Sequence, residues 1–344
     1  MINNCDLEVE LKDRNQTYNP GDTVSGTVHV EVSKDCRCDA LNLSLEWFTH
    51  GRGNARSEIV DLQSLFQGDW TAGEHHAYDF ETTVPPGPYT YHGNYLNVDW
   101  RVKAHADIPW ALDPTAEREL TLEPTGTEET FRPGEEHKAE TVLAATDNDQ
   151  TISWSDALIG SISLISGLGL IAFLRSTDQF LGALLLAVPF IGVGGLFVYL
   201  SVRNYFAEQR LGDVDVHLDP GDASPGETVR CRVEMEPPST VTLNEVTVRL
   251  HGHEKVVSGS GTNETTYTHT VHDEETTISR SKQATIRSGR RTFRTSLALP
   301  SSAPFSFYAR DNQMRWDVEV HVDVPNWPDW VHTDLVTVRP GARS

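Results

Sequence analysis

The sequence PGDTVSGTVHV, residues 20–30, is a tight turn followed by a strand, and it decides how the rest of the chain is interpreted. Val24, Val28 and Val30 alternate with polar residues, which is typical of a strand that buries one face. The sequence PGETVRCRVEM, residues 225–235, repeats this turn and this alternation 205 positions later. The chain is therefore predicted to contain the same β unit twice.

The repeat continues through both units. The offset of 205 also aligns a strand bearing Leu41, Leu43 and Leu45 with one bearing Val246, Val248 and Leu250. Further along, an offset of 216 aligns Pro88 with Pro304, Trp100 with Trp316, Val102 with Val318, Ile108 with Val324 and Pro109 with Pro325. The offset changes because surface loops vary in length. We therefore predict a mainly β protein with two tandem immunoglobulin-like β-sandwiches, at residues 1–124 and 211–340.

Both units present their motifs in the same order. A Pro-Gly-acidic turn precedes a strand, an alternating aliphatic strand follows, and a proline–aromatic segment leads to Trp100 or Trp316, which opens a long strand ending in proline. This order resembles the arrestin-like superfamily, which includes arrestins and sporulation-control relatives with sandwiches in tandem. The resemblance covers residues 1–124 and 213–340 and implies protein recognition. We carry over no functional residue from it.

Two uncharged segments, 157–174 and 180–202, separate the sandwiches. As helices they would reach roughly 27 and 34 Å, close to the bilayer's hydrocarbon thickness of about 30 Å. We therefore expect a transmembrane helical hairpin within residues 154–206, with the lipid bilayer as a partner; the alternative is a helical hairpin buried in a soluble protein. Small residues favour close helix packing, and the candidates are Ser163, Gly167, Gly192 and Gly195.

The start of the chain has neither a basic nor an apolar leader region, so no secretory signal is expected. Together with the predicted hairpin, this start predicts an integral membrane protein whose two sandwiches both lie in the cytoplasm.

Residues 125–153 contain many acidic side chains, which predicts a solvated tether. The formal charge of −22, from 50 acidic and 28 basic residues, repels phosphate backbones and excludes nucleic acid as a partner.

The histidines His251 and His253 lie two apart on a predicted strand and therefore share one face. His269 and His272 could come from the neighbouring strand. Such a group would suit a transition metal, whereas the alternative is a set of solvent-facing histidines in a polar hairpin. A second candidate site consists of Trp327, Trp330 and Trp110, which either form a patch that binds a partner or rests on the membrane, or close the ends of the sandwiches.

No nucleophile elbow, Walker loop or dinucleotide fingerprint occurs in the sequence, so we expect neither catalysis nor a cofactor. The leading hypothesis is a membrane-anchored adaptor that recognises protein partners through sheet edges at the cytoplasmic face. One alternative is a self-assembling structural membrane protein, a homo-oligomer formed through the hairpin. The other is a metal- or ligand-binding module.

Overall fold

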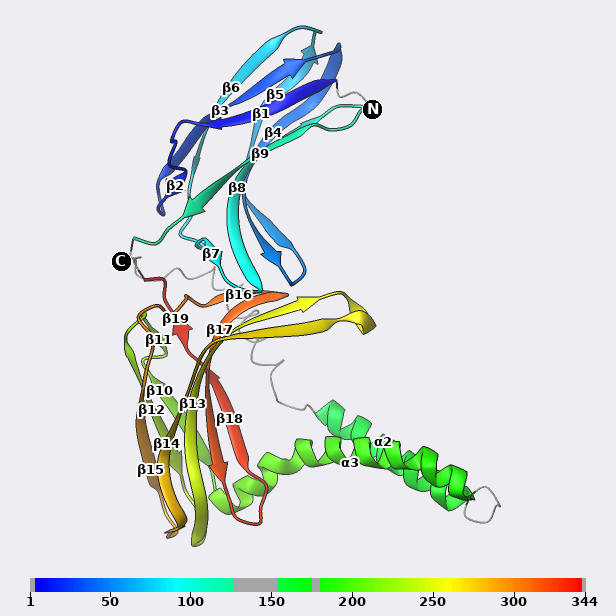
Figure 1. The fold of residues 1–344 in the computed structure, drawn as a ribbon, viewed down its shortest axis with the longest axis vertical. Coiled ribbons are helices and arrows are strands. Elements are labelled where there is room, and N and C mark those ends of the chain that lie inside the picture. Colours follow the sequence, from blue (N-terminus) through cyan, green and yellow to red (C-terminus); the bar gives the residue numbers. More distant parts are fainter. Residues whose placement is uncertain (1–3, 126–153, 175–179, 342–344) are drawn as a thin grey trace.

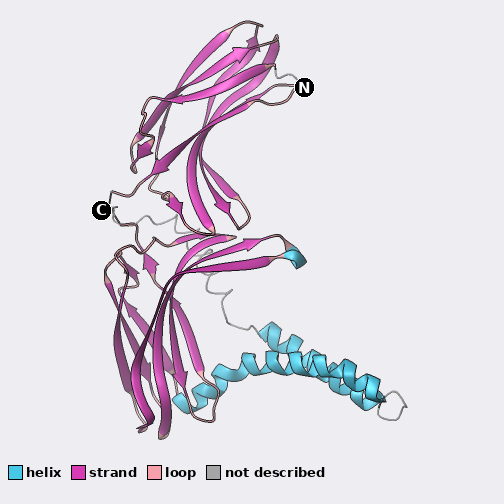
Figure 2. Cartoon of the chain, in the orientation of Figure 1, coloured by secondary structure: helices cyan, strands magenta, loops and turns pink. Residues whose placement is uncertain are grey.

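The computed structural model describes residues 4–125, 154–174 and 180–341. Strands dominate, and the two sandwiches lie end to end with a pair of helices projecting beside the second one (Figures 1 and 2). We call β1–β9 the N-terminal sandwich and β10–β19 the C-terminal sandwich. The predicted tether, residues 125–153, lies outside the described residues except for its first position.

The N-terminal sandwich consists of two packed sheets. One sheet has the order β1-β3-β6, with β1 Cys5–Leu11, β3 Thr23–Val32 and β6 His75–Thr83. The other has the order β2-β9-β8-β4-β5, and β7 pairs with β8. Its strands are β2 Thr17–Tyr18, β4 Cys36–Gly51, β5 Arg56–Trp70, β7 Tyr91–His92, β8 Leu96–Asp107 and β9 Thr115–Leu122. Their alternating apolar residues meet between the sheets and form one core.

The C-terminal sandwich repeats this plan. One sheet has the order β10-β12-β15, with β10 Val214–Asp219, β12 Thr228–Met235 and β15 Arg291–Ala298. The other has the order β14-β13-β17-β16, with β18 also on β17. Its strands are β13 Val241–Ser258, β14 Thr265–Ile286, β16 Phe307–Ala309, β17 Asn312–Asp323 and β18 Trp330–Leu335. The short strands β11 Asp222–Ala223 and β19 Thr337–Val338 pair in parallel, and a 3-10 turn spans Gly261–Asn263.

Residues aligned by the two sequence offsets make equivalent contacts. The Trp100 indole donates to the Pro88 carbonyl at 2.6 Å, and Trp316 donates to Pro304 at 2.9 Å. The turn glycines Gly21 and Gly226 also match, with φ of +85° and +82°, a backbone conformation that glycine adopts without strain. Each unit therefore uses the same turn and the same tryptophan bond to fix its long strands.

The helices α2, Trp154–Leu174, and α3, Phe180–Leu211, lie alongside each other (Figure 1). Ser163 donates to the Phe190 carbonyl at 3.2 Å. A Cβ at Gly167 would lie 2.8 Å from the Ile191 side chain, so this glycine lets the helices approach. A Cβ at Gly195 would touch Leu164, whereas Gly192 faces open space.

Within the described ranges, no helix combines the length and the apolarity that crossing a bilayer requires. This finding contradicts the predicted transmembrane hairpin and the integral membrane localisation, together with the cytoplasmic placement that depended on them. The prediction counted residues without charge, which is a weaker condition than the sustained apolarity of a spanning helix. Moreover, α3 continues beyond the uncharged segment to Leu211 and ends against the C-terminal sandwich.

Candidate functional site

The face of β13 that points away from the core carries two histidines. Along this strand Leu250, Gly252 and Glu254 face inward and are buried. His251 and His253 therefore occupy the opposite face, because side chains alternate along a strand. On the neighbouring strand β17, Asp317 lies directly across from His251, and Arg315 lies directly across from His253.

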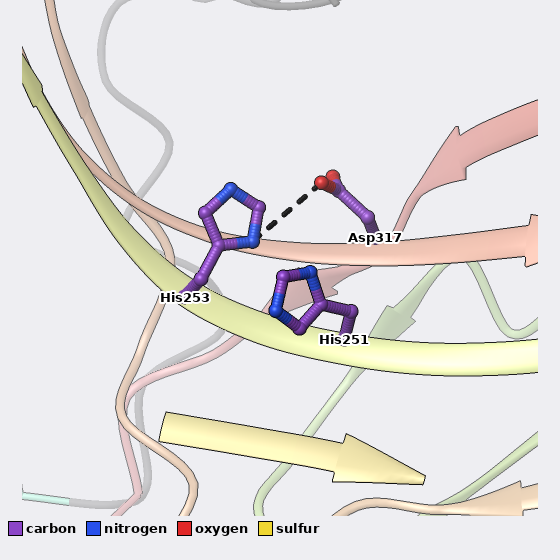
Figure 3. Close-up of side chains that lie close together, drawn as sticks. All are labelled: His251, His253 and Asp317. Atoms are coloured by element: carbon purple, nitrogen blue, oxygen red, sulfur yellow. Dashed lines mark ion pairs between the residues drawn. The ribbon is translucent and has the colours of Figure 1, made fainter. Parts of the chain in front are cut away.

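Figure 3 shows His251, His253 and Asp317 drawn together. One donor atom from each of the three side chains lies within 4.8 Å of the other two. The imidazole rings stack with centroids 4.5 Å apart and an interplanar angle of 22°. His253 Nδ1 is 3.7 Å from Asp317 Oδ2, and both side chains are largely buried, at 6% and 10% exposure.

The surroundings of this cluster fix its orientation and charge. A terminal nitrogen of Arg315 donates to Asp317 Oδ1 at 3.1 Å, and the Arg315 side chain is 1% exposed. His251 Nε2 lies 3.1 Å from the Thr270 hydroxyl. Burial, reinforced by Arg249, lowers the pKa of His251, which favours the neutral imidazole. A neutral imidazole and a neighbouring carboxylate are both good metal ligands.

The other two histidines lie on the inward-facing side. His269 is across from Glu254 in the β13–β14 register, and its ring is 3.0 Å from the Asn94 amide. The His272 ring lies 5.8 Å from the Trp316 ring. The structure thus brings together two of the four predicted histidines. It adds Asp317, which sequence reasoning missed because only the β13–β17 register reveals its position.

The tryptophan candidates occupy different environments. Trp330 is buried, and its indole donates to Glu208 of α3 at 3.3 Å. Trp327 is half-buried, with the Arg210 guanidinium 4.5 Å above its ring. These two residues hold the end of α3 against the C-terminal sandwich. Trp110, at the tip of the N-terminal sandwich, is fully exposed.

A buried carboxylate connects the two sandwiches. Glu254 of β13 has 0% exposure and accepts a bond from the Tyr91 hydroxyl at 2.6 Å. It also accepts from the backbone amides of Asn94 and Tyr95, at 2.9 and 2.6 Å. Burial and the Glu254 carboxylate raise the pKa of Tyr91 above its usual range, so the phenol keeps its proton and donates. The sequence places Glu254 beside the predicted histidine group but gives no sign of this contact, since the partners belong to the other sandwich.

The β5 strand forms one edge of its sheet and exposes apolar side chains there. Residues 57–60 are all exposed, which shows that neither face of the strand is covered there. Ile59 is 55% exposed and Leu62 is 60% exposed. Among the described residues, β5 pairs with β4 on one side and with no strand on the other. Exposed edges of this kind can pair with another chain.

Comparison with known proteins supports the fold. The family model described as arrestin (or S-antigen), N-terminal domain, matches residues 214–341. No curated protein matches the chain. The crystal structure of Spo0M, the sporulation control protein from Bacillus subtilis, is 20% identical, with a TM-score of 0.30 over 42% of this chain and 57% of that chain. The match thus covers less than two thirds of the length of that protein. The family match supports an arrestin-like fold for the C-terminal sandwich.

Proposed function

We propose that this protein is a non-enzymatic adaptor that binds an extended segment of a partner protein along the β5 edge. An arrestin-like fold is consistent with protein interaction in general, but fold does not identify the surface used. The observation that favours β5 is the exposure of Ile59 and Leu62 on a strand that ends its sheet. A partner strand would add to this edge through backbone hydrogen bonds, with side-chain contacts giving selectivity.

The two long edge strands differ in character, which favours β5 over β14. Along the described part of β14, the side chains are mostly threonines and charged residues, with Val271 as an exposed apolar exception at 38%. Charged side chains such as Asp273, Glu274 and Glu275 of β14 protect a sheet edge from pairing with other chains. The β5 segment instead presents several apolar side chains close together.

Charge indicates the chemistry of the partner segment. Glu58 is exposed beside the apolar side chains of β5, and the whole chain has a net charge of −22. A segment with alternating apolar and basic residues would complement both the apolar contacts and the negative charge. We therefore expect partner binding to weaken as the salt concentration rises.

Site-specific photocrosslinking tests this proposal. A photoreactive residue at position 60 on β5 should capture a partner that the same residue at position 276 on β14 does not. The crosslinked stretch of the partner, made as a synthetic peptide, should bind purified full-length protein and slow amide exchange in β5. Leu62→Asp should weaken this binding at least tenfold, whereas Val271→Asp, the matched change on the other edge, should leave it unchanged.

Two outcomes would overturn the proposal. In the first, the captured peptide binds the Leu62→Asp protein as well as it binds the wild type. In the second, position 60 crosslinks to another copy of this chain, and the purified protein sediments as a dimer that Leu62→Asp dissociates. That result would assign the β5 edge to self-association.

A further inference from the structure

We propose that His251, His253 and Asp317 form a zinc-binding site on the outer face of the C-terminal sandwich, independent of the adaptor surface on β5. Two imidazoles and one carboxylate are a donor set that Zn²⁺ accepts, and three protein ligands leave a fourth position for water or a partner's side chain. Calcium and magnesium prefer oxygen donors, so two imidazoles disfavour both ions.

The geometry is close to what Zn²⁺ requires. Tetrahedral Zn²⁺ with bonds of about 2.0–2.2 Å places its ligand atoms about 3.3 Å apart. His253 Nδ1 and Asp317 Oδ2 are already 3.7 Å apart, and the three donor atoms all lie within 4.8 Å of one another. Small side-chain rotations would therefore complete the site while β13 and β17 keep their register (Figure 3).

Groups around the donors hold them in place. Arg315 donates to Asp317 Oδ1, which leaves Oδ2 facing His253. Hydrogen-bonded partners of this kind orient metal ligands, and their loss typically weakens metal binding. The positive charge of the Arg315 guanidinium repels a bound cation. However, Arg315 bonds Asp317 Oδ1, whereas the metal would bind Oδ2. The Thr270 hydroxyl, 3.1 Å from His251 Nε2, fixes the second imidazole.

The N-terminal sandwich offers a matched control with the same residue types. His50 and His92 both contact Asp99, each at 2.7 Å, but they bind different carboxylate oxygens. The two contacting nitrogens therefore do not converge on one carboxylate oxygen. A metal that needs three convergent donors should not prefer this group, so His50→Ala removes a histidine without touching the proposed site.

The test uses full-length protein stripped with a chelator and then titrated with Zn²⁺ by calorimetry, and with Co²⁺ by visible absorption. We expect one Zn²⁺ per chain and the strong absorption of tetrahedral Co²⁺. His251→Ala and Asp317→Asn should each weaken Zn²⁺ binding at least tenfold, and His50→Ala should bind like wild type. Zn²⁺ should raise the thermal unfolding midpoint of wild type and of His50→Ala, but not of His251→Ala.

The design separates a lost site from a misfolded protein. His251 is only partly buried, and Asp317→Asn retains an oxygen that can accept the Arg315 bond. Circular dichroism should therefore show both variants folded. The proposal is overturned if wild type binds no stoichiometric Zn²⁺, or if the folded His251→Ala protein binds as tightly as wild type. It is equally overturned if His50→Ala removes the binding.

Discussion

At the scale of single residues, Glu254 shows how a fully buried carboxylate is tolerated. Removing such a group from water is costly unless donors replace the lost hydration. Tyr91, Asn94 and Tyr95 supply those donors from one short segment of the N-terminal sandwich. Gly93 permits the approach, because a Cβ at this position would lie only 1.7 Å from Glu254 Oε1.

Gly93→Ala should therefore destabilise the protein by about 1–3 kcal/mol, the range expected when an added methyl group overpacks a buried neighbour. Urea unfolding followed by fluorescence gives the free energy of unfolding. Gly221→Ala is the matched control, since a Cβ there meets nothing within 4 Å, and it should change stability by less than about 0.5 kcal/mol. Equal stability of Gly93→Ala and wild type would show that Glu254 is not held as described.

The environment of His332 predicts that the free energy of unfolding depends slightly on pH. Its hydrogen bond with Asp334 raises its pKa above the ordinary value of 6.5. A raised pKa in the folded state stabilises the protein below about pH 6.5, and this stabilisation disappears as the pH rises through the folded-state pKa. Both side chains are about 40% exposed, so solvent screening limits the effect to about 0.5 kcal/mol.

His332→Gln should therefore be less stable than wild type at about pH 5.5 and equally stable at about pH 8.5. Denaturant titrations at both pH values measure the difference. Thr266→Gln, a change at an exposed position of β14 that does not titrate, provides the control and should show the same difference from wild type at both pH values. A His332→Gln deficit that grows with pH would contradict the assigned direction of the pKa shift.

At the scale of elements, the end of α3 belongs to the C-terminal sandwich. Ala207 and Leu211 are fully buried in its core. Glu208 and Arg210 contact Trp330 and Trp327 respectively. The last turns of the helix therefore pack as part of the sandwich, and the two tryptophans cover them.

Trp327→Ala should lower the free energy of unfolding by about 1–2 kcal/mol, because it removes a cation–π contact and the packing around it. Trp110→Ala is the matched control, as its side chain is fully exposed, and it should have an effect below about 0.5 kcal/mol. Chemical denaturation of the two variants makes the comparison. A larger loss for Trp110→Ala would mean that the exposed tryptophan is covered in solution.

At the scale of the whole molecule, the two sandwiches share buried contacts. Leu96 and Val98 of the N-terminal sandwich are fully buried within the core cluster of the C-terminal one. The Asn312 amide donates to the Thr49 hydroxyl at 3.1 Å and to the Asn54 carbonyl at 2.7 Å. Polar and apolar contacts therefore both resist separation of the two units.

We expect both sandwiches of the wild type to unfold in one calorimetric transition. Asn312→Ala should cost about 1–3 kcal/mol, because it leaves buried groups without their donor, and should split or broaden that transition. Asn244→Ala removes an exposed amide bonded to Asp323 and should leave the transition sharp. Two transitions in the wild type would show that the sandwiches unfold independently.

The sequence by itself determined the mainly β character and the internal repeat. Alternation at Val24, Val28 and Val30 depends on neighbouring residues, and the matched pairs Pro88–Pro304 and Trp100–Trp316 are visible by alignment of the chain with itself. Counting uncharged residues was a poorer guide, since the described helices did not meet the requirements of a bilayer span. Local periodicity is reliable because it needs no knowledge of which strands pair.

Only the tertiary structure decided the candidate sites. His251 and His253 are close in sequence, but Asp317 joins them through the β13–β17 register, and His269 is turned toward the other sandwich. The donors around Glu254 likewise come from far along the chain. Such groupings depend on strand register and on how the sandwiches pack, and a shift of one residue along a strand moves every side chain to the opposite face.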